Sequence, residues 1–363
     1  MAVDWKDPRH SNELIVQMVS QTNPGTVIGE LGGIDRTESS LSAMYYSDTR
    51  VSGTLVFIGD GWVRGSFLRL IHRIPEWGWS RTLGTFAVSK DDAVRKDGTW
   101  RTTLELRSML HTLAEDHAEK PWTLAKGASP LAAMQQVLRA AGRPYVSSGA
   151  LGGRITSALV MESGESQLSR LFALSEASGN RIDVDGDGDI TIGKYVPPSQ
   201  HASTWELDLE DPRGLVVDGL TRSTDWLSIP SRVIVIHKDG EREVSGHADS
   251  TGATSAASRG YRISQVRQLD EMSPATAQRA QQLARKYLAE ESVELVEWEM
   301  EMPYLPIWEG DVVDLIVHDG PQRYRGRRKC LVKSLDLDLG DMSMRLRLKE
   351  TASGDKGEDE LDD

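Results

Sequence analysis

The stretch "LDLDLGDMSMRLRL", residues 335 to 348, constrains the fold of this chain more than any other. Apolar and polar side chains alternate on both sides of Gly340-Asp341. Such alternation places every second side chain on the same face of a β-strand, and a two-residue turn that contains glycine joins two strands into a hairpin. We therefore predict a hairpin whose apolar side chains share one buried face: Leu335, Leu337, Leu339, Met342, Met344, Leu346 and Leu348.

Alternating strands account for most of the remaining chain. Residues 13 to about 110 contain several such segments separated by glycine-containing turns, which is typical of a β-barrel or a β-sandwich. The pattern returns after residue 200 and is strong from 296 to 302. Because 363 residues are too many for one ordinary core, two to four domains are expected. The predicted fold class is a multidomain, β-rich α+β protein.

Helical patterns interrupt the strands at three places. Ser129 and Pro130 open the first helix and Gly142 ends it. A second helix is predicted within residues 163–179 and a third within 273–291. The third carries an apolar face: Ala277, Ala280, Leu283, Ala284, Tyr287 and Leu288. Between strands, the region 241–270 is rich in Ser, Gly, Ala and Thr, which fits either a flexible linker or loops within a small insertion.

The stretch "IDVDGDGDIT", residues 182 to 191, resembles a calcium-binding loop. Counting from Asp183 places aspartates at the first, third and fifth positions of an EF-hand loop, but its twelfth position is Lys194 instead of a bidentate glutamate. Pro197 and Pro198 prevent the helix that should follow. The flanking residues alternate, so we predict a β-hairpin turn here, with weak metal binding at 183–189 left open.

The sequence contains no recognisable catalytic motif. It has no GxSxG elbow, no HExxH pair and no P-loop, and "GELGGID" lacks the spacing of a dinucleotide-binding turn. The pairs Asp336/Asp338 and Glu297/Glu299 each place two carboxylates on one sheet face, as a glycosidase pair would. Because they alternate with apolar residues, the solvated face of a sheet is the better interpretation. We therefore expect no enzyme, no catalytic residue and no cofactor.

Histidine and cysteine residues offer little for a metal site. His111 and His117 are six residues apart and so do not share a helix face, although Asp116 lies beside them; we expect surface histidines at a domain junction. Cys330 is the single cysteine, which excludes a disulfide within the chain. Its alternating surroundings predict a buried structural thiol. No metal ligand set is predicted.

Trp77 and Trp79 form the one aromatic pair that suggests recognition. They stand in "IPEWGWS", after a predicted strand, where exposed tryptophans can bind sugars or anchor an interface. Core packing or a subunit contact fits the sequence equally well. Ten Trp against four Phe is an unusual ratio and favours large interfaces.

Charge and targeting signals narrow the class of protein. The net charge of −13 argues against general binding to the phosphate backbone of nucleic acid. Part of this charge lies in residues 353–363, which we predict to be a disordered acidic tail. The N-terminal residues are polar and no apolar run is long enough to span a bilayer. We expect a soluble protein that is made or assembled in the cytosol.

The order of features resembles the baseplate hub proteins of tailed phages, also called tail-associated or minor tail proteins. The resemblance runs from about residue 13 to 350. It is carried by "ESSLSAMYYSDTRVSGTLVF", "LGTFAVS", "DWLSIPSRVIVIHKDG", "GYRISQVRQLDEMSPATAQRAQQLARKYLAEE" and, most specifically, "MPYLPIWEGDVVDLI". Ser231 departs from the asparagine that is frequent at the corresponding position of the family, which weakens the assignment of that strand.

The resemblance implies a homotrimer of four-domain subunits with two β-barrel tube-type domains per chain. These barrels would be residues 1–112 and residues 201–240 with 293–352. A small α+β peripheral domain would cover 113–200, and an inserted domain with one helix would cover 241–292. Six barrels per ring would continue a sixfold tail tube above a threefold tip.

The implied partners are the tail tube or distal tail protein, the tape-measure protein and a spike or fibre protein. Genomic DNA would pass through the channel without specific binding, and the protein would reside in the tail tip of the virion. Two other functions compete with this one: a tail-tip protein that binds host glycan or degrades cell wall, and a secreted β-rich binding module. The chain stops after its final hairpin and has no signal peptide, which counts against both.

Overall fold

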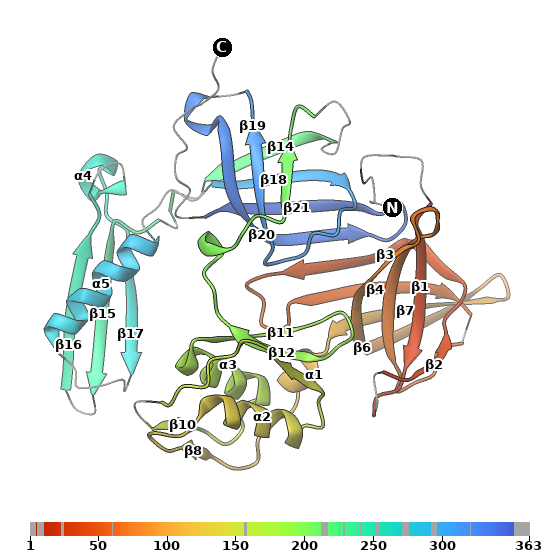
Figure 1. Cartoon of the computed structure of the whole chain (residues 1–363), viewed down its shortest axis with the longest axis horizontal. Coiled ribbons are helices and arrows are strands. Elements are labelled where there is room, and N and C mark those ends of the chain that lie inside the picture. The colour runs from red at the N-terminus through yellow and green to blue at the C-terminus, as the bar shows by residue number, and fades with distance from the viewer. Residues whose placement is uncertain are drawn as a thin grey trace. The chain divides into compact units, whose positions relative to one another are not determined.

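The computed structural model describes residues 5, 11–22, 25–59, 61–155, 158–211, 217–224, 226–227, 229–239, 242–251, 254–270, 276–291, 296–319 and 321–351. The predicted tail at 353–363 lies outside these residues. The chain divides into two compact units, 1–220 with 299–348 and 221–298 with 349–363 (Figure 1). Within the described residues, no helix is both long enough and apolar enough to cross a membrane.

A 13-stranded sheet dominates the first unit and takes its strands from two distant parts of the sequence. The N-terminal strands are β1 (Glu13–Val19), β2 (Val27–Glu30), β3 (Ile34–Met44), β4 (Val51–Ile58), β5 (Phe67–Ile74), β6 (Trp79–Lys96) and β7 (Thr99–Ser108). The others are β13 (Trp205–Asp208), β14 (Val217–Thr224), β18 (Val296–Pro303), β19 (Val312–Val317), β20 (Gly326–Asp338) and β21 (Ser343–Glu350).

The two sets of strands meet where β20 pairs antiparallel with β3. The strand order is β14-β18-β21-β20-β3-β4-β7-β6-β5-β1-β2, with β19 beside β20 and β13 beside β19. Among the described strands this order does not return on itself, so no closed barrel is detected. The β-rich character of the chain is confirmed, whereas the two separate barrels remain a prediction.

The hairpin predicted at 335–348 is formed by β20 and β21, and all seven of its predicted core side chains are buried. The prediction of a two-residue turn was wrong. Four residues, 339–342, lie between the strands, and Met342 has a left-handed backbone with φ of 58°. The turn lengthens because the Asp338 carboxylate accepts the Gly340 amide proton and the Asp341 carboxylate accepts that of Ser343.

A small α+β part packs its own core within the first unit. Its elements are α1 (His111–Ala114), β8 (Trp122–Leu124), α2 (Pro130–Ala140), β9 (Tyr145–Ser147), β10 (Leu159–Met161), α3 (Gln167–Ser178), β11 (Asn180–Val184) and β12 (Ile190–Lys194). The hydroxyls of Ser129 and Ser166 accept backbone N–H groups at the starts of α2 and α3, as capping residues do. Leucines of both helices pack against Ile182, Ile190 and Ile192 of the hairpin. Both predicted helices are confirmed here.

The second unit contains a three-stranded sheet covered on one face by a helix (Figure 1). Its elements are β15 (Arg232–Asp239), β16 (Arg242–Asp249), α4 (Ala256–Arg259), β17 (Ser264–Asp270) and α5 (Ala277–Glu291). The strand order is β16-β15-β17. The helix backbone approaches the sheet closely at Gly246, where an added Cβ would lie 2.3 Å from the Gln281 nitrogen. Ala280, Ala284 and Leu288 are buried against the strands, whereas Ala277, predicted on the same face, is exposed.

This unit extends beyond the insertion predicted at 241–292. The strand β15 pairs with β16 and β17 in register along its whole length, so it belongs to the small sheet. Ser231, the residue that departs from the hub family, is buried at the start of β15. Its hydroxyl donates to the Ile263 carbonyl and accepts the Ile263 amide proton, which fastens β15 to the segment before β17. The described part of the region 241–270 thus contains β16, α4 and β17, and the insertion itself stays a prediction.

Candidate functional site

Trp77 and Trp79 lie in an aromatic cluster that also contains Trp5, His72 and Tyr304. Trp5 meets the other two tryptophans edge to face, with ring centroids 5.7 Å from Trp77 and 4.7 Å from Trp79. The His72 ring is 5.2 Å from Trp79 and 4.6 Å from Tyr304. Both predicted tryptophans are half-buried. Their contacts favour the packing interpretation over an open sugar platform.

The cluster joins segments that are distant in the sequence. Trp5 also lies 6.4 Å from Trp205 in β13 and 6.1 Å from Tyr304, so it bridges the N-terminal strands to the later ones. His72 Nε2 is 2.8 Å from the Asn12 side-chain oxygen, which fixes the ring. Burial raises the pKa of Tyr304 to about 12, so this phenol stays neutral. The cluster therefore stabilises the contact between the N-terminal strands and the later ones, and it contains no charged nucleophile.

The paired acids lie on the solvated side of the sheet, as expected. Glu299 of β18 forms ion pairs with Arg345 and Arg347 of β21, and Glu301 also pairs with Arg345. On β20, the Asp338 carboxylate accepts a turn N–H group. Glu299 is thus held by arginines of a neighbouring strand and Asp338 by its own turn, an arrangement that stabilises the sheet.

The histidines and the cysteine form no metal site in the described part of the chain. His111 Nε2 lies 3.6 Å from Glu115, and His117 Nδ1 lies 3.0 Å from the Glu115 carbonyl oxygen. Across the described residues, no group of three His, Cys, Asp or Glu is placed to hold an ion. Cys330 is buried in β20, as predicted.

The aspartate-rich turn is a hairpin turn, as predicted, and it also docks onto the large sheet. The strands β11 and β12 pair antiparallel from Val184↔Ile190 to Asn180↔Lys194. The Thr85 hydroxyl of β6 donates to the Gly186 carbonyl at 2.9 Å, and Arg69 of β5 donates to the Asp187 carbonyl at 3.1 Å. Mutual repulsion with Asp185 and Asp187 adds to burial in raising the pKa of Asp189. No residue pattern around this turn had indicated that it docks on another strand.

Substitution of Gly188 by alanine is expected to lower the free energy of unfolding by about 2–3 kcal/mol. Gly188 has φ of 90°, and a Cβ there would lie 3.0 Å from Thr85 Cβ and 3.2 Å from Met109 Cγ. Backbone strain at residue 188 and the clash with β6 therefore both lower the stability of the variant. Urea denaturation measures the loss, with Gly127→Ala as the control.

Gly127 has a similar φ of 84° but open space around the Cβ position. Its substitution introduces only backbone strain, about 1 kcal/mol. Equal losses of stability in Gly188→Ala and Gly127→Ala would contradict the docking of the aspartate-rich turn on β6.

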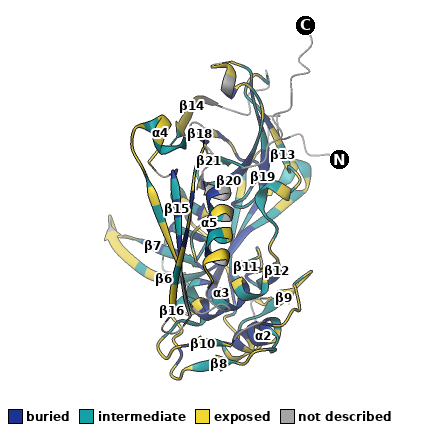
Figure 2. Ribbon diagram, turned by 90° about the vertical axis from the view of Figure 1, so that its left-hand side faces the viewer, coloured by how far each residue is buried: buried dark blue, intermediate teal, exposed yellow. Residues whose placement is uncertain are grey.

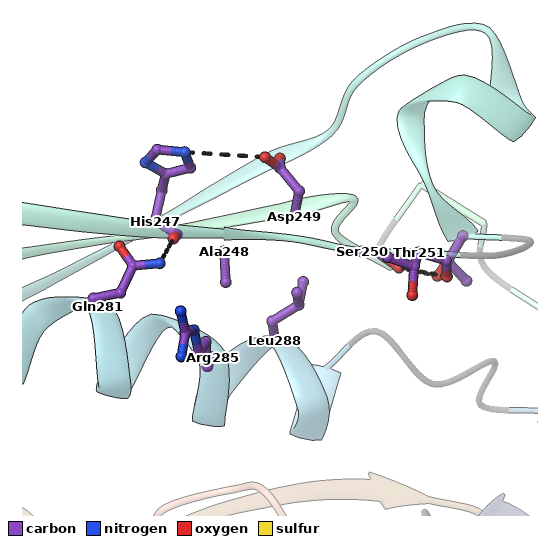
Figure 3. Close-up of a pocket in the computed structure, with 9 residues that line it drawn as sticks. His247, Ala248, Asp249, Ser250, Thr251, Gln281, Arg285 and Leu288 are labelled. Atoms are coloured by element: carbon purple, nitrogen blue, oxygen red, sulfur yellow. Dashed lines mark hydrogen bonds and ion pairs between the residues drawn. The ribbon is translucent and has the colours of Figure 1, made fainter.

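A polar groove lies between β16 and α5 in the second unit (Figure 3). Gln281 donates to the His247 carbonyl at 2.6 Å, and the His247 ring lies 4.0 Å from the Asp249 carboxylate. Asp249 is also held by two hydrogen bonds from Arg232. These contacts tie the helix and strands together.

Exposed strand edges are a further feature of the large sheet that individual motifs did not indicate. β6 pairs with β5 only as far as Phe86, so residues 87–96 have β7 as their sole described neighbour. The arm turns at Asp97-Gly98, as predicted, and its outer part is exposed (Figure 2). Val94, 65% exposed, and Trp100 project from it. Unpaired strand edges with exposed apolar side chains are suited to pairing with another chain.

The edge strand β2 has the same character. It pairs only with β1 among the described strands, and its Val27 and Ile28 side chains are exposed. The large sheet thus presents unpaired backbone groups at β2 and along the β6 arm. Both surfaces belong to the first unit.

Comparison with known proteins relates this architecture to solved structures. No protein-family model and no curated protein sequence matches the chain. The structure is similar to the tail protein of Neisseria meningitidis MC58, with a TM-score of 0.67 and 14% identity over 93% of this chain and 96% of that one. The 43 kDa tail protein of prophage MuSo2 from Shewanella oneidensis matches with a TM-score of 0.64 and 14% identity, covering 93% and 98% of the two chains.

The chain has the fold of phage tail proteins. Prophage tail protein gp18 of Listeria monocytogenes EGD-e is also similar to this chain, with a TM-score of 0.58 and 10% identity over 94% of this chain and 95% of that one. The tail-protein fold predicted from the order of sequence motifs is therefore confirmed. These matches extend over nearly the full length of both chains in each comparison.

Proposed function

We propose that this protein is a structural component of a phage tail tip, in which three copies form a closed hub ring. The ring would continue a sixfold tail tube and present threefold symmetry to the tip. The tail-protein fold, matched along nearly the whole chain, carries the proposal. Each subunit would contribute two tube-type regions, 1–112 and 201–240 with 293–352 but without β15, because the other strands of both stretches lie side by side in one sheet.

Closure of the ring would satisfy the free strand edges. An open sheet leaves backbone N–H and C=O groups unpaired at its margins, and edge-to-edge contacts between copies would pair them. The exposed apolar side chains of β2 and the β6 arm would be buried in the same contacts. The small α+β part at 113–200 and the inserted domain would occupy the periphery.

The partners follow from a position between tube and tip. The ring would bind the tail tube or distal tail protein and the tape-measure protein on one side and a spike or fibre protein on the other. The net charge of −13 suits a channel through which DNA slides without adhering. In this role the protein is a non-enzymatic virion component.

The mass of the purified chain in solution tests the ring. We expect light scattering to give about 120 kDa, three times the 40.1 kDa of one chain. The double variant Val27→Lys/Ile28→Lys should shift the mass toward one chain, because lysines on an edge strand prevent edge pairing. Val160→Lys on β10, a similarly exposed position outside the large sheet, is the matched control and should keep the trimer mass.

A chain that remains a monomer at every concentration would contradict the proposed self-assembling ring. A trimer mass retained in the variant with both lysines on β2 would show that the subunit contact does not use this edge. Circular dichroism of each variant verifies that the strands persist.

A further inference from the structure

A groove of about 410 Å³ lies between the turn after β3 and the small α+β part. One wall is formed by residues 45–50, and the other by the end of α3, by β11 and by Tyr195 after β12. All of these belong to the first unit. The groove combines guanidinium groups with aromatic rings, a composition found at ligand sites.

Two arginines line the groove around the buried ring of Tyr45. The Arg181 guanidinium lies 4.4 Å from the ring centroid and the Arg50 guanidinium 5.5 Å from it. Arg181 donates to Asp183 from Nε at 3.0 Å, and a second nitrogen makes the same pair. Asp183 is therefore committed mainly to Arg181.

Arg50 lacks a comparable partner. Its side chain is only 12% exposed, its nearest carboxylate oxygen is 3.9 Å away on Asp183, and its Nε is buried with no hydrogen-bond acceptor among the described residues. Its backbone is left-handed, with φ of 60°. A buried, charged donor without an acceptor costs free energy, and strained backbone conformations cluster at binding sites. The arrangement calls for an anion supplied from outside.

Glu309 lies behind this wall, and its protonation state affects the charge balance around Arg50 and Arg181. The Gly310 backbone packs against Tyr45 and Arg181, so that a Cβ there would lie 3.0 Å from the ring and 3.2 Å from the guanidinium. Glu309 is 9% exposed, and burial, reinforced by Asp183, raises its pKa to about 8. At neutral pH the carboxyl is therefore protonated, so that around the Tyr45 ring the two guanidiniums face the single carboxylate of Asp183.

The mouth of the groove adds rings and hydrogen-bond acceptors. Tyr46 and Tyr195 are exposed, and Phe172 is half-buried beside them. The carboxylates of Asp48 and Glu176 also line the groove, and neither forms an ion pair with a described residue. Flat aromatic faces stack on pyranose rings, and carboxylates accept hydroxyl protons.

We propose that this groove binds an acidic saccharide unit, with its carboxylate on Arg50 and Arg181 and its ring against the exposed tyrosines. A single negative charge matches the Arg50 guanidinium, whose Nε has no acceptor among the described residues. Multiply acidic peptides would be repelled by Asp48 and Glu176, whereas the hydroxyls of a sugar would be bound by them. This site is independent of the ring contacts proposed above.

Saturation-transfer NMR on the full chain at pH 6.5 tests the proposal with two matched probes, methyl β-glucuronide and methyl β-glucoside. We expect the glucuronide to bind about tenfold or more tightly than the glucoside, because they differ only in the carboxylate. N-acetylglutamate methylamide, an amino-acid carboxylate, should bind as weakly as the glucoside. Equal binding of glucuronide and glucoside, or of glucuronide and amino-acid carboxylate, would overturn the assignment.

Variants identify the groups involved. Arg50→Gln and Tyr46→Ala should each weaken glucuronide binding, the former by about tenfold, whereas Arg64→Gln at a highly exposed position should not. Binding should fall above pH 8 as Glu309 ionises, and Glu309→Gln should retain it there. Unchanged binding in both Arg50→Gln and Tyr46→Ala would rule the groove out, and Tyr46→Ala remains informative even where Arg50→Gln fails to fold.

Discussion

Replacing Leu337 with alanine is expected to lower the free energy of unfolding by about 3 kcal/mol, a loss typical of truncating a fully buried leucine. Leu337 of β20 lies opposite Leu41 of β3, and each is 1% exposed. This pair occupies the seam at which strands from the beginning and the end of the chain meet. The loss arises from removed methyl groups and from the cavity left in a seam that two strands hold rigidly.

Urea denaturation of the Leu337→Ala, Leu41→Ala and double variants measures how much the two leucines stabilise the contact between β20 and β3. Because the two side chains share one cavity, the double variant should lose less stability than the two single variants combined. Leu227→Ala, at a leucine 71% exposed, is the control and should change stability by less than about 0.5 kcal/mol. Strict additivity of the two seam variants would show that the leucines do not pack on each other.

Local patterns predicted the hairpins and helices because their information is contained in a few neighbouring residues. The alternation around Gly340 specifies the β20–β21 pair, and Ser129 specifies the start of α2 through a hydrogen bond to Ala132. The hairpin between Ile182 and Ile192 is likewise local. Turn length depends on side-chain hydrogen bonds within the turn, which alternation does not encode, and this is why the 339–342 turn was predicted too short.

Pairing between distant strands could not be predicted in the same way. The alternation in β15 fits the large sheet and the small one equally well, and only its register with β16 and β17 assigns it to the second unit. Similarly, nothing in the sequence around Trp5 indicates that its ring meets Trp79 and Trp205. Such contacts depend on the topology of the whole sheet.

The groove was missed because its residues are individually unremarkable. Glu309 occurs in "IWEGD", which looks like a polar turn, yet the fold buries it behind Tyr45 and Arg181. Arg50 occurs in a turn with other polar residues, where a solvated arginine is the ordinary expectation. The left-handed backbone of Arg50 and the burial of its guanidinium appear only in the folded chain.

Glu309→Gln is expected to make the protein progressively more stable than the wild type as the pH rises from 5.5 to 9. The pKa of Glu309 is raised from 4.5 to about 8 in the folded chain, chiefly by burial. A carboxyl with a raised pKa stabilises the fold fully below its unfolded pKa, and this stability is lost between the unfolded and folded values. The difference between variant and wild type should therefore grow by roughly 3 kcal/mol over this pH range.

Thermal or urea denaturation at pH 5.5, 7 and 9 measures this difference, and subtraction of the wild type cancels the titration of the other groups. Glu105→Gln, the same carboxyl-to-amide change at a side chain of β7 that is 42% exposed, is the control for the substitution itself. A difference that stays constant with pH would mean that Glu309 is ionised in the folded protein and neutralises Arg50. In that case Arg50 would already be neutralised within the chain, so the stability measurement also decides whether an anion is required beside it.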